Sequence, residues 1–254
     1  MSTMALPTYS LWSRDLKHFL RQRSRVIGAV GQPFVIWIFL AAGFRESFSS
    51  AGMDYGAWLF PGVILLIALF AAIFSTISII EDRKSGFLQG VITSPAPRVS
   101  IIWSKMFAGT TIAVLQSLLF MILLPFTGIE LSLQGFLLSL LVLAAASMML
   151  TLLGFILAWK MSSAQGFHAI MNLLLIPMWL LSGAFFPAAG ASGWMQAVMM
   201  LNPMYYITGL FQQMFFLDSG ISLSGGPAPW ISIPVLAAAS LLLYLYSMRI
   251  VRTP

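Results

Sequence analysis

The chain has 254 residues, of which 59% are hydrophobic and 8% are charged. A soluble domain carries about 25% charged residues, so this chain cannot cover a water-facing surface, and its mean hydropathy of +0.94 indicates a protein of the lipid bilayer. The net charge of +6 does not indicate a nucleic-acid partner, because no polar domain is present to carry a basic surface.

The first predicted element is an amphipathic helix over residues 8–25. Apolar and basic side chains alternate there at helical spacing, namely Tyr9, Trp12, Leu16, Phe19 and Leu20 with Arg14, Lys17 and Arg21 between them. Such a helix is typical of the membrane interface, where its basic groups lie near lipid phosphates. A disordered basic arm is the alternative. A cleaved signal peptide is not expected, since the following apolar run is too long.

Six apolar blocks follow, and each is close to the roughly 20 residues that cross a bilayer. They cover approximately residues 26–43, 58–80, 101–126, 136–159, 167–186 and 230–248. Only helices satisfy their own backbone in lipid as single segments, so the prediction is an all-α integral membrane protein with one transmembrane domain over residues 1–254. The stretch 187–217 is also apolar, but Asn202-Pro203 interrupts it, which predicts a re-entrant helical hairpin on the outer side before the last span.

The basic residues orient this bundle. With both termini in the cytoplasm, all of the 13 lysines and arginines except Arg45 fall on the cytoplasmic side. This asymmetry follows the positive-inside rule, and it places the segment between the second and third spans in the cytoplasm as well.

That cytoplasmic segment, residues 81–100, contains four consecutive charges and a short apolar face. The charges are Glu81, Asp82, Arg83 and Lys84, and the face consists of Phe87, Leu88, Val91 and Ile92, spaced as on one side of a helix that Pro95 and Pro97 end. A helix of two turns is marginal by itself. It therefore packs either into the groove of a cytoplasmic partner or against the membrane or its own bundle, and the residues alone leave both readings open.

The segment resembles the corresponding loop of type-2 ATP-binding-cassette exporter permeases. In these proteins a charged cluster at the end of the second span precedes a glycine, an apolar stretch and then Ser/Thr-Pro-x-x-Arg. Here the charged cluster is followed by Gly86 and then by Ser94, Pro95 and Arg98. The chain has Ser104-Lys105 where the family often has Gly-Lys.

A second resemblance to the same family lies near the C-terminus. The family signature of a Ser-Gly-x-x-Phe-Pro turn, a tryptophan and Asn-Pro-x-x-Tyr is matched by Ser182, Gly183, Phe186, Pro187, Trp194, Asn202, Pro203 and Tyr206. The resemblance implies that this turn and hairpin form an outer gate. A static cap is the alternative, because glycine and proline more often mark fixed turns.

The resemblance further implies a permease of the inner membrane that exports its substrate, that pairs with a second permease chain, and that is driven by two separate ATPase subunits holding ATP and Mg²⁺. Residues 81–100 would couple those subunits to the spans. The chain itself has no phosphate-binding loop, so it is not expected to be an enzyme. The alternative is a membrane anchor or scaffold for an ATPase, with no substrate crossing. Secondary transport is disfavoured, since the sequence shows no inverted halves.

No catalytic, metal-binding or cofactor site is predicted. The chain lacks cysteine, which excludes cysteine-bound metals. "HAIMN" and "GASG" resemble local motifs of rhomboid proteases, but no histidine follows Ser192 to serve as its base. The spans carry few ionisable groups, and Gln116, Ser117, Thr151 and Asn172 are the scattered polar candidates for a pathway. Hydrogen bonding between helices is their alternative role. The sequence does not distinguish between a drug, a lipid and a polysaccharide as the substrate.

Overall fold

The computed structural model describes residues 4–44, 54–217 and 226–252, with the side chains at 23–27, 29 and 30 excepted. Within these ranges the chain is built from α-helices and short 3-10 helices, without strands, as predicted. The helices are α1 Ala5–Arg21, α2 Arg23–Gly43, α4 Tyr55–Ser75, α5 Ser78–Lys84, α6 Phe87–Thr93, α7 Val99–Met121, α8 Leu133–Lys160, α9 Ala164–Leu180, α10 Gly193–Leu201, α11 Pro203–Phe215 and α12 Pro229–Arg252.

Four helical stretches are long and apolar enough to cross a membrane: Tyr55–Lys84, which joins α4 and α5, together with α7, α8 and α12. The chain is therefore a multi-pass membrane protein. α9 and the apolar part of α2, Gly31–Gly43, are shorter, so the six-span topology stays a prediction. α9 ends at Leu180, earlier than the predicted boundary at 186, because a turn with a left-handed glycine follows it.

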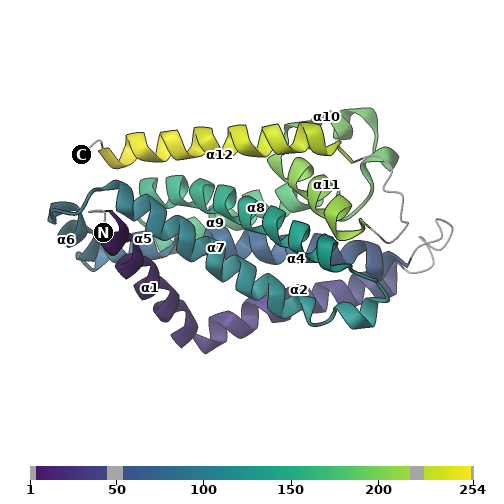
Figure 1. The fold of residues 1–254 in the computed structure, drawn as a ribbon, viewed down its shortest axis with the longest axis horizontal. Helices are drawn as coiled ribbons and strands as arrows, with labels where there is room; N and C mark the ends of the chain where they lie inside the picture. The colour runs from purple at the N-terminus through teal and green to yellow at the C-terminus, as the bar shows by residue number, and fades with distance from the viewer. Residues whose placement is uncertain (1–3, 45–53, 218–225, 253–254) are drawn as a thin grey trace.

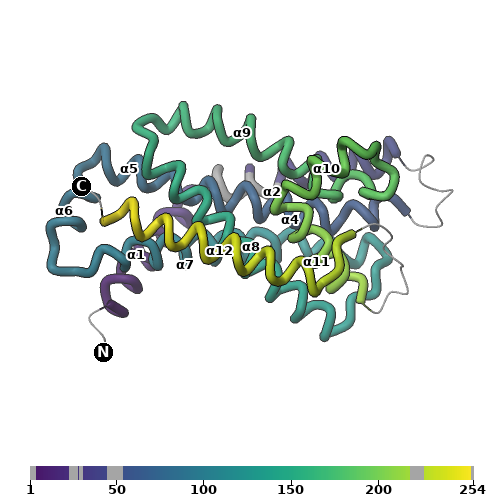
Figure 2. The backbone as a smooth tube through the Cα atoms, turned by 90° about the horizontal axis from the view of Figure 1, so that it is seen from above, coloured from purple at the N-terminus to yellow at the C-terminus, as the bar shows by residue number. Residues whose placement is uncertain are grey.

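The central element is α4, which buries almost every residue along its length. It contacts α2, α7, α8, α9 and α11. α12 lies along one outer face of the bundle (Figure 1), and α9 runs along another edge (Figure 2). Both outer helices bury only four residues each and turn large apolar side chains outward, as expected for surfaces whose solvent is lipid.

Both described ends of the chain lie at the same end of the bundle as α5 and α6, and α10 and α11 lie at the opposite end (Figure 1). The Arg98 guanidinium, just before α7, donates to the backbone carbonyls of Val251 and Arg252 at 3.3 Å each and so ties this segment to the C-terminal helix. The predicted topology, with both termini and residues 81–100 in the cytoplasm, requires these segments to lie at one end of the bundle. Arg45, the predicted outer arginine, lies outside the described residues.

Two glycines allow α7 and α8 to approach α4 closely. A methyl group on Gly109 of α7 would overlap the Thr151 side chain of α8 and would lie 2.7 Å from the Ser75 hydroxyl oxygen of α4. A methyl group on Gly154 of α8 would lie 2.9 Å from Thr76 Oγ1. Small residues at such contacts are the usual way in which membrane helices pack.

We expect Gly109→Ala to lower the free energy of unfolding by about 1–3 kcal/mol, the usual cost of overpacking. Titration of the purified protein with sodium dodecyl sulfate in mixed micelles, followed by circular dichroism, measures the change. Gly31→Ala is the matched control, because a methyl group there meets no atom within 4 Å. Equal stability of the two variants would contradict the proposed three-helix contact.

Candidate functional site

The four consecutive charges of the cytoplasmic segment do not share one environment. They lie at the end of α5, where the helical turn of about 100° per residue points neighbouring side chains in different directions. Asp82 is buried and Arg83 is half-buried, whereas Glu81 and Lys84 are exposed. The segment therefore divides its charges between the interior and the surface.

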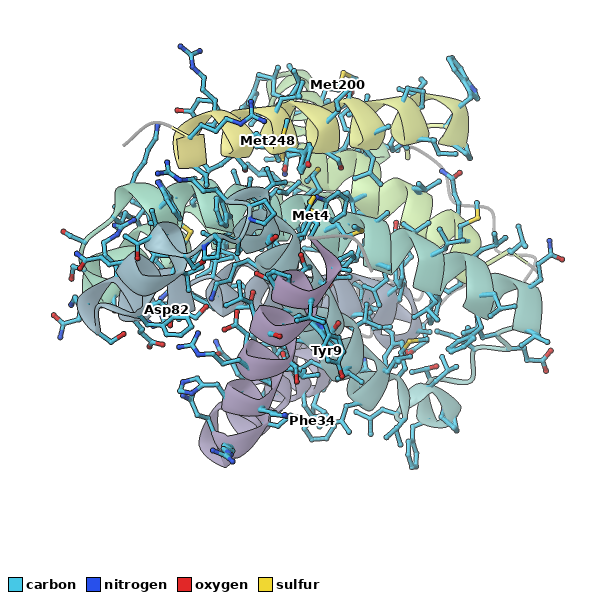
Figure 3. The ribbon with its side chains drawn as sticks, turned by 60° about the vertical axis from the view of Figure 1, so that its left-hand side comes forward. Met4, Tyr9, Phe34, Asp82, Met200 and Met248 are labelled. Atoms are coloured by element: carbon cyan, nitrogen blue, oxygen red, sulfur yellow. The ribbon has the colours of Figure 1, made fainter. Side chains whose placement is uncertain are left out.

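Asp82 is the centre of a charge cluster formed by Arg14, Asp15, Asp82 and Lys105, in which the Arg14 side chain is 42% exposed and the other three are largely buried. Two guanidinium nitrogens of Arg14 donate to the Asp82 carboxylate, one of them to Oδ2 at 3.1 Å. Lys105 Nζ lies 3.1 Å from the same Oδ2 and 2.7 Å from Asp15 Oδ2, and it donates to Ser78 Oγ at 2.8 Å. The cluster joins α1, α5 and α7, and Figure 3 shows Asp82 beside α1.

The composition of the charge cluster explains how it can be buried. Its two acids and two bases cancel, and buried charges are tolerated only when they are paired and hydrogen-bonded. The hydrogen bond to Asp82 raises the pKa of the Arg14 guanidinium above its ordinary value. Arginine is charged in proteins in any case, so this hydrogen bond only reinforces its charge. The Lys105 side chain is 6% exposed and has a carboxylate on each of two sides.

Arg83 connects α5 to the end of α8. Its guanidinium donates to the Trp159 carbonyl at 2.6 Å and to the Met161 carbonyl at 3.0 Å, and it lies 5.7 Å from the centre of the Trp159 ring. The last carbonyls of a helix have no partner within the helix, so a buried helix end needs a donor of this kind. Arg83 and the charge cluster together fix α5 against α1, α7 and α8.

The apolar face of α6 is turned largely toward the bundle. Leu88 is buried in the main core, and Val91 and Ile92 pack against it. Packing against its own bundle, one of the two alternatives left open by the sequence, therefore accounts for three of the four face residues. Phe87 is 38% exposed, and the Arg14 guanidinium lies 3.8 Å from its ring centre.

The termini of α6 follow the sequence motif. Gly86 precedes the helix with φ +77°, a left-handed conformation that glycine adopts without strain. At the other end Ser94 Oγ donates to the Val91 carbonyl at 2.7 Å, and Pro95 follows. The surface that α5 and α6 present outward consists of Glu81, Lys84, Phe87, Gln89, Gly90 and Thr93.

The interfacial helix α1 packs on α7 rather than standing free of the bundle. Trp12 Nε1 donates to Thr111 Oγ1 at 3.2 Å, and Phe19 packs against the main core. Lys17 and Arg21 are exposed, as the prediction of a basic outer face requires. Asp15 was not predicted to be a site residue, and Lys105 was considered only as a cytoplasmic basic residue and as part of the Ser104-Lys105 pair that stands where the family often has Gly-Lys. The signal was available, since Asp15 is the only acid in α1 and Lys105 interrupts an apolar span.

The late motif forms a connected turn at the other end of the bundle. Gly183 has φ +82°, and Ser182 Oγ both donates to the Trp179 carbonyl and accepts from the Ala184 N–H. Tyr55 on α4 donates from its hydroxyl to the Phe185 carbonyl at 3.0 Å. Trp179 Nε1 donates to the Gly62 carbonyl at 2.8 Å, which holds the end of α9 against α4.

Asn202 joins the two halves of that motif. Its amide nitrogen donates to the carbonyls of Met178 and Leu181 at 2.6 and 3.1 Å, and its amide oxygen accepts from the Met204 N–H at 3.0 Å. One side chain thus caps the C-terminus of α9 and the N-terminus of α11, where Pro203 occupies the first position. Phe186 packs in a small satellite core, while Trp194 is largely exposed and Tyr206 donates to the Met200 carbonyl.

These helices, with the two motifs at opposite ends of the bundle, are those of a multi-pass membrane protein. The chain matches the ABC-2 type transporter family over residues 7–216 and therefore belongs to it, which confirms the resemblance.

The name of one similar protein agrees with this family. The chain is 25% identical, over 191 residues, to a protein of Cyanophora paradoxa named "Putative transport permease ycf38". The alignment covers 73% of this chain and 66% of the relative, so the chain spans slightly less than two thirds of the relative's length.

We expect Lys105→Met to lower the free energy of unfolding by about 3 kcal/mol, because it leaves two buried carboxylates with one partly exposed guanidinium. The sodium dodecyl sulfate titration measures this change. Lys84→Met is the matched control, since it removes an exposed cation, and it should unfold like the wild type.

Adding Asp15→Asn to Lys105→Met should recover part of the lost stability, because it removes one uncompensated carboxylate. If Lys105→Met were as stable as Lys84→Met, the charge cluster would not hold α1, α5 and α7 together.

For the outer motif, we expect Asn202→Ala to destabilise the protein by about 1–2 kcal/mol, the range for loss of a helix cap. Asn202→Ser should cost less, because a serine hydroxyl can still accept from the Met204 N–H, although it cannot bridge to both carbonyls of α9. Unfolding midpoints of the three proteins test this order. Identical midpoints for alanine and serine would show that the cap on α11 contributes nothing.

Proposed function

We propose that the chain is the membrane-spanning permease of an ATP-binding-cassette exporter in the inner membrane. Its termini and the α5–α6 segment face the cytoplasm, it pairs with a second permease chain, and two separate ATPase subunits holding ATP and Mg²⁺ drive it. The observation that carries the proposal is the anchoring of α5–α6, at the end of the bundle that holds both described chain ends, to α1, α7 and α8. No observation favours a scaffold without transport.

The anchoring supports a coupling role for residues 81–100. A loop that only connected two spans would bend when a partner pressed on it. Here Asp82 ties α5 to α1 and α7, and Arg83 ties it to α8, so a displacement of α6 moves these helices as one body. ATP drives the cycle if the ATPase pair binds it better in one conformation than in the other.

The surface that we propose is offered to the ATPase is the mostly polar outer side of α5 and α6. The apolar face is mostly used inside the bundle, so the partner meets the edge of Phe87 and the polar residues around it. Gly90 lies in the middle of this surface, and a Cβ added there meets no atom within 4 Å. A bulky residue at position 90 would therefore block a partner without disturbing the bundle.

At the opposite end we propose that the turn at Gly183 and the α10–α11 hairpin form the outer gate. Opening would break the hydrogen bonds of Asn202 to the end of α9, since this side chain links the turn to the hairpin. Each such hydrogen bond contributes a net stability of about 0.5–1.5 kcal/mol, which is small enough for a transport cycle to supply. That α10 and α11 are re-entrant belongs to the same proposal.

The test is co-purification with the ATPase subunit that accompanies the wild-type chain. Phe87→Ala should weaken association about thirtyfold if Phe87 is an interface anchor, and Gly90→Trp should abolish it. Lys84→Ala should change little, because an exposed rim charge is screened by salt. The purified chain alone should hydrolyse no ATP.

Circular dichroism and gel filtration of each variant establish that it is folded, which matters for Phe87→Ala because this ring also stacks on Arg14. If Phe87→Ala and Gly90→Trp both retain the ATPase and its transport-linked hydrolysis, then α6 is not the coupling element.

A further inference from the structure

A cavity of about 560 Å³ lies between α2, α4, α7 and α9, with Phe19 of α1 at its edge. Most of its wall is aliphatic or aromatic, and the apolar lining includes Leu66, Ile67, Phe70, Phe74, Ile176 and Trp179. Small-molecule sites of about 300–1,000 Å³ bury most of a drug-sized ligand. The cavity therefore has the size and the apolar wall of a ligand site.

A few polar side chains converge on this apolar wall. α9 contributes His168 and Asn172, one turn apart and both exposed, while its Phe167 and Met171 are buried against the bundle. α2 contributes Gln32. Among the described residues that line the cavity there is no aspartate, glutamate, lysine or arginine. The described lining would give a charged group no counter-charge, which is costly within a membrane.

Gln116 of α7 is the polar residue that points most directly to a ligand. It lines the cavity and is 4% exposed, and its Oε1 has no hydrogen-bond partner within the described chain. Leaving a buried acceptor unpaired is unfavourable. Two other polar residues singled out from the sequence have partners: Ser117 Oγ donates to the Ile64 carbonyl, and Thr151 Oγ1 donates to the Ser147 carbonyl.

We propose that this cavity binds an uncharged, drug-sized amphiphile whose hydroxyl or amide group hydrogen-bonds to Gln116 and whose apolar body packs on Phe70, Phe74 and Trp179. A hydroxyl suits the Gln116 amide in either orientation, because it both donates and accepts. A polysaccharide does not suit the site, since most of its hydroxyls would face the apolar wall without partners. That this molecule is also the transported substrate rests on the export function proposed above, whereas its binding does not.

The probes are two photoreactive compounds, 4-(hydroxymethyl)benzophenone and its methyl ether, which differ in one hydrogen-bond donor. The full chain in detergent micelles is irradiated with increasing concentrations of each, and the labelled peptides are found by mass spectrometry. We expect saturable labelling of α4 and α9 around the cavity. The alcohol should saturate at a concentration about fivefold lower than the ether, as one net hydrogen bond implies.

Two variants locate the site. Gln116→Leu removes the unpaired acceptor and should make the alcohol and the ether label equally. Ala71→Phe places a ring at the cavity wall, where Ala71 lies, and should abolish saturable labelling. Ala238→Phe is the matched control on the outer helix α12, where position 238 is exposed, and it should change neither result.

Labelling that is unsaturable and unchanged in Ala71→Phe would overturn the proposal, because it would show only partition into the apolar surface. Equal labelling by alcohol and ether in the wild type would overturn the role of Gln116. Neither measurement uses ATP or the ATPase, so a failure of the export proposal is seen separately, in the co-purification experiment.

Once saturable binding is established, the complex reconstituted in vesicles decides whether the bound compound is carried. ATP-dependent movement of the alcohol probe, lost in Ala71→Phe, is the expected result. If the probe binds saturably but is not transported, the cavity is a ligand site, and the proposal that its ligand is the transported substrate is wrong.

Discussion

The neutralisation of Asp82 is the constraint on which this end of the molecule depends. A carboxylate at 5% exposure in so apolar a chain needs cations brought to it, and they come from α1 and α7. Because Arg14 lies on α1, the amphipathic helix cannot drift along the membrane surface independently of the spans. Because Lys105 lies within α7, the start of that span is held at a fixed height beside α5.

The same physical requirement is met differently at the two ends of the bundle. Where α8 ends, an arginine supplies donors to the last carbonyls; where α9 ends, an asparagine does so. The last carbonyls of a helix have no partner within the helix, so a helix that ends against the rest of the fold is stabilised by a donor from elsewhere in the chain. Both donors lie in the segments that were singled out from the sequence as motifs, which gives those motifs a structural role before any functional one.

The helices were predictable from the sequence because hydropathy acts locally. The block expected at 136–159 is α8, Leu133–Lys160, and the break at Asn202-Pro203 separates α10 from α11. The end of α9 was placed too late, since "LSGAFFP" is apolar enough to resemble a span while Gly183 turns the backbone. The end of α9 is therefore set by the backbone turn at Gly183 and not by the hydropathy of the sequence.

Contacts between distant segments could not be predicted in the same way. Arg14 and Asp82 are 68 residues apart, and nothing in one sequence pairs them. The apolar face of α6 was recognised, but its direction was not, because a short amphipathic helix has the same pattern whether it faces a partner or its own bundle. Gln116 and Asn172 were named as pathway candidates alongside Ser117 and Thr151, and only the packing of α2, α4, α7 and α9 separates the two pairs.

The division of the charges in α5 between the interior and the surface also decides which of these positions can be replaced without loss of the fold. Asp82 and Arg83 are committed to the fold, so their replacement costs stability whatever the partner is. Glu81 and Lys84, immediately next to them, are exposed and can vary at little cost to folding. Within one helical turn, therefore, two charged positions contribute to the stability of the bundle, and the two that flank them can be exchanged with little effect on folding.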